Sequence, residues 1–133
     1  MVWDLLGHLW RLQRSLREET EKGLEHLGIS GLEAWLLRVL QLHPYPSEAA
    51  RRMGLPLPTV SHMLKRLEEG GLVVRTLDPK DLRRFAFRLT DGGEEALSRA
   101  EALMAEALRR RLACLSPEEV RALLRLLARL EEA

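Results

Sequence analysis

A short segment in the middle of the chain combines apolar residues at helical spacing with polar residues between them. The apolar set would face a protein core: Val60, Met63, Leu64 and Leu67. The polar set is left on the outside of the same helix: Thr59, Ser61, His62, Lys65 and Arg66. Hydroxyls, an imidazole and two cations are suited to hydrogen bonds with nucleic acid base edges and to contacts with phosphates. The segment therefore predicts a helix that presents a polyanion-binding face.

A basic hairpin is predicted directly after this helix. Residues 72–76 and 84–89 have the alternating or apolar character of strands, and the polar stretch 77–82 between them would form the protruding tip. The tip region contains three cations: Lys80, Arg83 and Arg84. Their side chains are long enough to enter a neighbouring minor groove or to reach its phosphates.

Three arginines in or near this unit have other interpretations. Arg66 is either a DNA contact or a structural residue that ties its helix to the hairpin. Arg75 and Arg88 are interpreted as charges on the strand surface that contact phosphates weakly or not at all.

The charge of the chain is concentrated in this middle part. The whole chain has a net charge of +1, whereas residues 44–90 hold +4, residues 1–43 hold −1 and residues 91–133 hold −2. A basic middle between acidic flanks can mark a polyanion-binding face, although composition alone can also produce it. The charge pattern thus supports the motif but does not establish it.

Two helices are predicted before this unit. Apolar residues at helical spacing over 3–27 indicate a long first helix, whose end Gly23 and Gly28 would loosen. Ser30 and Glu33 have the spacing of a capping box, in which each side chain accepts a hydrogen bond from the other's backbone N–H. They would begin a second helix that runs to about Leu42.

A short third helix over 48–52 is expected between a proline-rich stretch and a glycine. Pro46 and its neighbours break the second helix, Ser47 would cap the third, and Gly54 would end it. The helix with the polar face follows, with Pro58 tolerated in its first turn.

Two more helices are predicted in the last third of the chain. Thr90 would begin the fifth, which runs to about Cys114, and a capping box at Ser116 and Glu119 would begin the sixth. The chain is short, so the apolar residues of the first and last helices have little else to pack on. A second copy of the chain is therefore an expected partner.

These residues resemble MarR-type transcriptional regulators across residues 30–93. The resemblance lies in the polar helix and the Gly-Gly-Leu-Val after it, and in the hairpin that follows. The wing of that family reads Asp-x-Arg, and Leu-Thr then closes the second strand. Asp81, Arg83, Leu89 and Thr90 stand at those offsets.

The resemblance implies a mainly α fold, a winged helix-turn-helix with a small β-hairpin wing. It implies that residues 30–90 form the DNA-binding domain and that residues 1–29 and 91–133 form a helical dimerisation region. By position, Arg83 would enter the minor groove and Asp81 would help to hold the wing. Two departures stand out: Pro56 replaces a polar cap, and His62 replaces an arginine found in many members.

The predicted function is a cytoplasmic transcriptional regulator, a repressor that binds double-stranded DNA as a homodimer on an inverted repeat. A small-molecule effector that changed the spacing of the two DNA-binding lobes would lower the affinity for DNA by linkage. A second interpretation stays open: a winged-helix architectural or protein-interaction module without operator specificity.

Other functional classes are not expected. The sequence has no G-x-S-x-G, no H-E-x-x-H and no phosphate-binding glycine loop, so no enzymatic activity is predicted. The one cysteine, Cys114, allows neither an internal disulfide nor a cysteine-based zinc site, and it is interpreted as a packing residue. No cofactor, no metal and no membrane segment are predicted.

Overall fold

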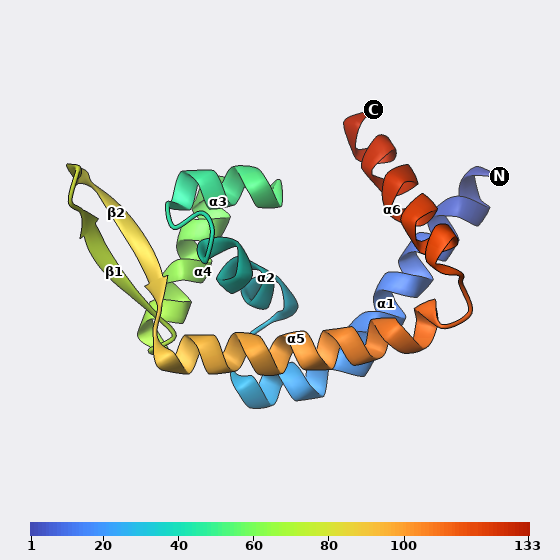
Figure 1. Cartoon of the computed structure of the whole chain (residues 1–133), viewed down its shortest axis with the longest axis horizontal. Helices are drawn as coiled ribbons and strands as arrows, with labels where there is room; N and C mark the ends of the chain where they lie inside the picture. The colour runs from blue at the N-terminus through green and yellow to red at the C-terminus, as the bar shows by residue number, and fades with distance from the viewer.

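The computed structural model describes residues 1–133 and is mainly helical, with one β-hairpin (Figure 1). The elements in chain order are α1 (Val2–Leu27), α2 (Gly31–Leu40), α3 (Pro46–Met53), α4 (Leu57–Glu69), β1 (Val73–Asp78), β2 (Asp81–Leu89), α5 (Asp91–Leu112) and α6 (Pro117–Glu132). The long helix α5 joins two parts of the molecule: α2, α3, α4 and the hairpin at one end, α6 and the start of α1 at the other. This architecture confirms the predicted fold class.

The helix boundaries follow the capping signals, with one exception. The capping boxes at Ser30 and Ser116 are both formed, and the Thr90 side chain accepts a hydrogen bond from the backbone of Gly93. The prediction that Ser47 caps α3 was wrong. The helix begins two residues earlier than predicted, at Pro46, with Tyr45 as its N-cap, because proline is already set for the first helical position and has no N–H to satisfy.

Two helices are shorter than predicted. Helix α2 ends at Leu40 rather than Leu42, and α5 ends at Leu112 rather than Cys114. Helix α1 ends at Leu27, as expected, and Gly28 after it has a φ of 75°, the left-handed conformation that glycine adopts without strain.

The hairpin is longer and its tip tighter than the sequence suggested. The strands are antiparallel, Leu77 pairs with Phe85, and Asp78 pairs with Asp81, so the tip is reduced to Pro79 and Lys80. The predicted six-residue tip was wrong because the side chain of Asp78 accepts the N–H of Lys80 at 2.9 Å and closes the turn early.

The hydrophobic core lies under the helix-turn-helix and continues into α5. Leu36, Leu37 and Val60 are fully buried in it. The first turn of α5 packs directly on the chain before β1. A Cβ atom on Gly93 would stand 2.0 Å from the carbonyl oxygen of Leu72, so this close approach requires glycine.

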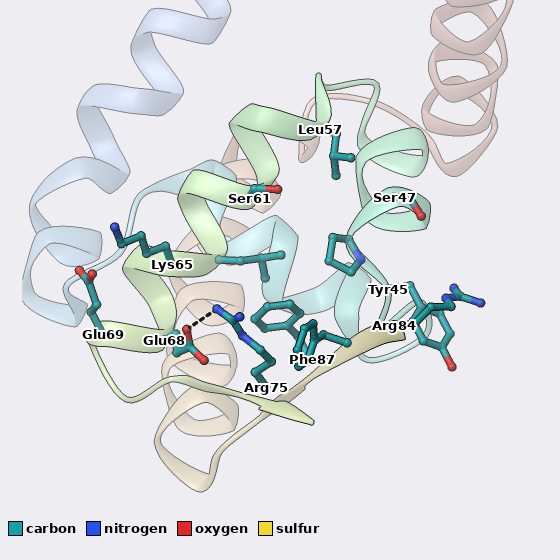
Figure 2. Close-up of a pocket in the computed structure, with 13 residues that line it drawn as sticks. Tyr45, Ser47, Leu57, Ser61, Lys65, Glu68, Glu69, Arg75, Arg84 and Phe87 are labelled. Carbon is teal, nitrogen blue, oxygen red and sulfur yellow. Dashed lines mark hydrogen bonds and ion pairs between the residues drawn. The ribbon is translucent and has the colours of Figure 1, made fainter. Parts of the chain in front are cut away.

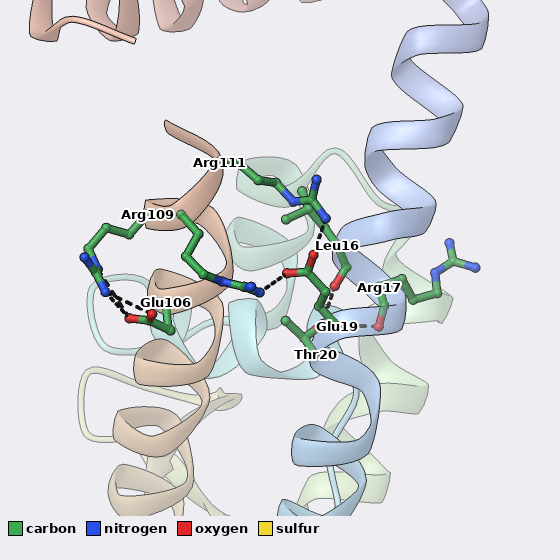
Figure 3. A network of polar contacts seen from close by, with 8 residues as sticks. Leu16, Arg17, Glu19, Thr20, Glu106, Arg109 and Arg111 are labelled. Carbon is green, nitrogen blue, oxygen red and sulfur yellow. Dashed lines mark hydrogen bonds and ion pairs between the residues drawn. The ribbon is translucent and has the colours of Figure 1, made fainter. Parts of the chain in front are cut away.

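Helices α1 and α5 are held together by close packing and by charge. At their crossing, a Cβ on Gly23 would lie 2.6 Å from Leu103 Cδ1. Further along, one carboxylate serves two arginines: Glu19 accepts from Arg110 at 2.8 Å and also from Arg111 (Figure 3). These contacts fix the direction in which α1 leaves the rest of the molecule.

The ends of the chain expose an unusual amount of apolar surface. Trp3 is 75% exposed, Leu124 is 64% exposed, and α6 buries no residue at all. Helices with an apolar stripe are normally stabilised by burying it, and an exposed apolar surface of this kind is typical of an interaction site. No helix is long and apolar enough to cross a membrane.

Candidate nucleic-acid interface

Helix α4 presents the predicted polar face to the outside. Its inner side is anchored by four buried residues: Val60, Met63, Leu64 and Leu67. Because this side is fixed, the opposite positions are exposed, and they are Thr59, Ser61, His62 and Lys65. The start of the helix is unusual. Pro56 is its N-cap and offers no side-chain cap, but its carbonyl accepts the N–H of Val60 at 3.2 Å.

A groove of about 590 Å³ separates α4 from the hairpin (Figure 2). Ser61 and Lys65 line it from α4, Ser47 lines it from α3, and Arg75 and Arg84 line it from the strands. Hydroxyls and cations thus occur on three sides of one concave surface.

Carboxylates on the same groove moderate its positive charge. Glu68 lies 3.1 Å from the guanidinium of Arg75. The same guanidinium lies over the ring of Phe85, 5.1 Å from the ring centre. Arg75 therefore ties the hairpin to α4. From the sequence, Arg66 was the residue considered for a link of this kind between the helix and the hairpin.

Near the tip of the hairpin, Lys80 of the turn and Arg83 of β2 extend into solvent. The side chain of Arg83 is 91% exposed. Asp81 holds this arginine twice, accepting its backbone N–H and its Nε, both at 3.1 Å. Asp81 thus orders the strand end that carries Arg83, which is the geometry implied for it by the family pattern.

Arg84 does not lie at the tip, so its predicted placement was wrong. It stands on β2, its guanidinium carbon lies 3.6 Å from the ring centre of Tyr45, and its Nη2 lies 3.9 Å from Glu48. The longer strands are the cause, because they move this position away from the turn.

Arg66 points toward α2 rather than toward the groove or the hairpin. Its Nε donates to Glu33 at 2.8 Å, and its Nη2 donates to Glu33 and to the carbonyl of Gly28, both at 3.0 Å. Both Nε and Nη2 thus donate within the protein, which is the geometry of a structural arginine. All five outward residues predicted on α4 are exposed, but only the guanidinium of Arg66 is bound within the protein.

Glu33 is the buried half of this ion pair. Its side chain is only 4% exposed, and burial alone would raise its pKa. The hydrogen bonds from Arg66 and from the backbone of Ser30, together with the charge of Arg66, outweigh burial and lower the pKa. Glu33 therefore caps α2 and anchors α4 at once.

Three residues of this region were missed as site residues in the sequence: Glu33, Tyr45 and Asp78. Glu33 was found only as a cap, because its partner lies 33 residues away. Tyr45 and Asp78 are also 33 residues apart and form a hydrogen bond of 2.9 Å. The one local signal was Asp78-Pro79, a dipeptide typical of turns.

A second cavity, of about 840 Å³, lies between α1 and the start of α2. Arg17, Glu21 and Leu24 line it from α1, Ser30 lies at its α2 edge, and Arg66 closes it from α4. The cavity thus touches both the long terminal helix and the helix with the polar face. No group of three or more His, Cys, Asp or Glu side chains is placed to hold a metal ion.

Comparison with known proteins identifies the family. A model of the MarR family matches residues 27–84. The transcriptional repressor MdtR of Bacillus subtilis is 32% identical over 139 residues, which cover 100% of this chain and 87% of MdtR. The chain belongs to the MarR family.

Solved structures agree with this assignment of a MarR-family regulator. PcaV of Streptomyces coelicolor, in complex with its natural ligand, is 25% identical, with a TM-score of 0.79 over 97% of this chain and 90% of PcaV. The S. aureus MepR–DNA complex shares the fold, with 24% identity and a TM-score of 0.82 over 95% and 96% of the two chains. The MarR-family chain is thus a winged-helix transcriptional regulator, as the sequence indicated.

Proposed function

We propose that this protein is a transcriptional repressor that binds an inverted-repeat operator as a homodimer and is released by a small molecule. The observation that supports this most is the pairing of an exposed polar face on α4 with an outward arginine at the hairpin tip. Helix and hairpin flank one groove, so a duplex that met one would meet both.

In this proposal α4 enters the major groove and Thr59, Ser61, His62 and Lys65 contact bases and phosphates. An α-helix fits that groove, which is about 12 Å wide. An imidazole offers fewer hydrogen bonds than an arginine guanidinium, so His62 would make fewer contacts with bases than an arginine at this position.

The wing supplies affinity rather than sequence preference. Arg83 would enter the neighbouring minor groove, Asp81 would hold it in place, and Lys80 would meet a phosphate. Arg84 and Arg66 support these contacts from within the protein. Their guanidinium groups are bound to Tyr45 and Glu33, respectively.

Residues 1–29 and 91–133 are proposed as the dimerisation region and residues 30–90 as the DNA-binding domain. The apolar faces of α1 and α6 are exposed in the single chain and would be buried against a second copy. Two-fold symmetry would place the two α4 helices about one DNA turn, roughly 34 Å, apart, which matches an inverted repeat.

The cavity between α1 and α2 is the proposed effector site. Its walls belong to the dimerisation region and to the DNA-binding domain, so a ligand there would alter the angle between them. A ligand that favours another lobe spacing than DNA requires lowers DNA affinity. PcaV, a relative of the same fold, holds a natural ligand.

Selection of genomic DNA fragments by the purified protein tests the proposal. The expected result is enrichment of one inverted repeat, weakened by Arg83→Ala. Salt-dependent retention of all fragments, with no enriched sequence, would favour the architectural module over the repressor.

A further inference from the structure

The connection between α2 and α3 reaches across to the hairpin through one side chain, Tyr45. This residue stands between two prolines, and its hydroxyl donates to Asp78 Oδ2 at 2.9 Å. Asp78 is the last residue of β1, is 5% exposed, and accepts the backbone N–H of Lys80 with its other oxygen at 2.9 Å. One carboxylate thus links Tyr45 to the turn at the hairpin tip.

The ring of Tyr45 is also covered from the second strand. Arg84 lies over it at 3.6 Å, a distance at which the cation is attracted to the face of the ring. Next to it, the N–H of Phe87 donates to the carbonyl of Pro44 at 2.8 Å. We call Tyr45, Asp78 and Arg84 the wing anchor.

The half of the hairpin nearer the tip has few other supports. The half farther from the tip is held by buried Phe87 and by the Arg75–Glu68 pair. Beyond them, Leu77 is 50% exposed and Leu82 is 71% exposed. An unsupported two-stranded hairpin is marginal in water, so the direction of the tip depends on the wing anchor.

The electrostatics of the wing anchor agree with this geometry. The pKa of Asp78 is lowered by the N–H of Lys80 and by the hydroxyl of Tyr45. The same hydrogen bond raises the pKa of Tyr45. The carboxylate is therefore charged at neutral pH, and the bond from Tyr45 is charge-assisted.

We propose that Tyr45 is a positioning residue for DNA binding. Through its hydrogen bond to Asp78 it holds the wing so that Lys80 and Arg83 contact the duplex while α4 occupies the major groove. The inference rests on the proposed function. In this proposal Tyr45 does not contact DNA and acts only through the wing.

Tyr45→Phe is the direct test, because it removes one oxygen and leaves the ring under Arg84. On a mixed-sequence duplex of about 30 base pairs in low salt, we expect affinity to fall by about three- to tenfold. The slope of log Kd against log salt should also become shallower by about 1 to 2, since wing cations no longer reach phosphates. The matched control is Thr76→Val, which removes a wing hydroxyl outside the anchor and should change neither quantity.

A double-mutant cycle separates positioning from general stability. In a Lys80→Ala/Arg83→Ala background, Tyr45→Phe should change affinity by less than about twofold, because the groups it positions are gone. Asp78→Asn, which keeps the side-chain shape, should weaken binding in the same way and not add to Tyr45→Phe.

Three results would overturn the inference. They are unchanged affinity in Tyr45→Phe, an unchanged salt slope, and an equal loss in the background without wing cations. A wild-type chain that bound no duplex at all would instead overturn the proposed function. A chain whose wing variants bind weakly while Tyr45→Phe binds normally would overturn the wing anchor alone.

Discussion

The substitution Glu33→Gln tests whether the charge of one buried carboxylate joins the N-terminus of α2 to α4. Glutamine keeps the size of the side chain and is itself accepted in a capping box, so the bond with Ser30 survives. What it removes is the negative charge that faces Arg66. The hydrogen bond from Arg66 Nη2 to the remaining oxygen, at 3.0 Å, then loses its charge assistance, and the bond from Arg66 Nε, at 2.8 Å, is lost because an amide NH2 cannot accept it.

The size of the effect follows from the exposure of the pair. Glu33 is 4% exposed, whereas Arg66 is 56% exposed, so the interaction lies between a surface pair and a buried one. Surface pairs contribute about 0–1 kcal/mol, and breaking a buried pair costs about 3–5 kcal/mol. We therefore expect the loss of the Glu33 charge to reduce the free energy of unfolding by about 1–2 kcal/mol, or about 3–8 °C in Tm.

Urea unfolding at several pH values is the assay, with all variants at one protomer concentration because dimer stability depends on it. The pKa of Glu33 is lower in the folded chain than its ordinary value of 4.5. The charge therefore stabilises the fold fully above that value, and this contribution is lost as pH falls through the lowered pKa. The difference between wild type and Glu33→Gln should be largest at neutral pH and shrink as the pH falls below 4.5 and through the lowered pKa.

Glu95→Gln is the matched control, because Glu95 and Arg99 form a pair of similar length, 2.8 Å, with both side chains about two-thirds exposed. It should leave stability unchanged within error at every pH. A difference in stability between wild type and Glu33→Gln that stayed the same from neutral to acid pH would show that shape rather than charge holds α2 to α4.

Three further substitutions test other parts of the structure. Arg83→Ala should lower affinity for every duplex and reduce the salt slope by about 1 per bound wing, measured by titration at several salt concentrations; unchanged binding would remove the wing from the interface. His62→Ala should change the ranking of operator variants more than the overall affinity, and equal losses on all of them would argue against base contacts there. Gly93→Ala should destabilise the fold by more than about 2 kcal/mol in thermal unfolding, since its Cβ meets the Leu72 carbonyl at 2.0 Å, and a wild-type Tm would show that α5 can shift.

Much of the fold was predictable because its signals are local. The capping box at Ser30, the left-handed Gly28 and the four-residue stripe of α4 each depend on neighbours within one or two turns. These signals fix where helices start and which side they bury. They were enough to place Thr59 and Ser61 on the outside.

The partners of the charged residues were not predictable in the same way. Arg66 meets Glu33 and Tyr45 meets Asp78 across 33 residues of chain, and no periodicity encodes such pairs. The predicted position of Arg84 was wrong for a related reason, because it depended on where the hairpin turns. A single hydrogen bond from Lys80 to Asp78 decided that.

The proposed function requires that two copies of the chain present two α4 helices to one duplex. Light scattering on the purified protein, alone and with the selected operator duplex, measures the mass of the free particle and of the complex. We expect a free particle of about 30 kDa, twice the 15.2 kDa of one chain, and a complex of two chains per duplex. A 15.2 kDa particle that binds the duplex one to one would contradict it.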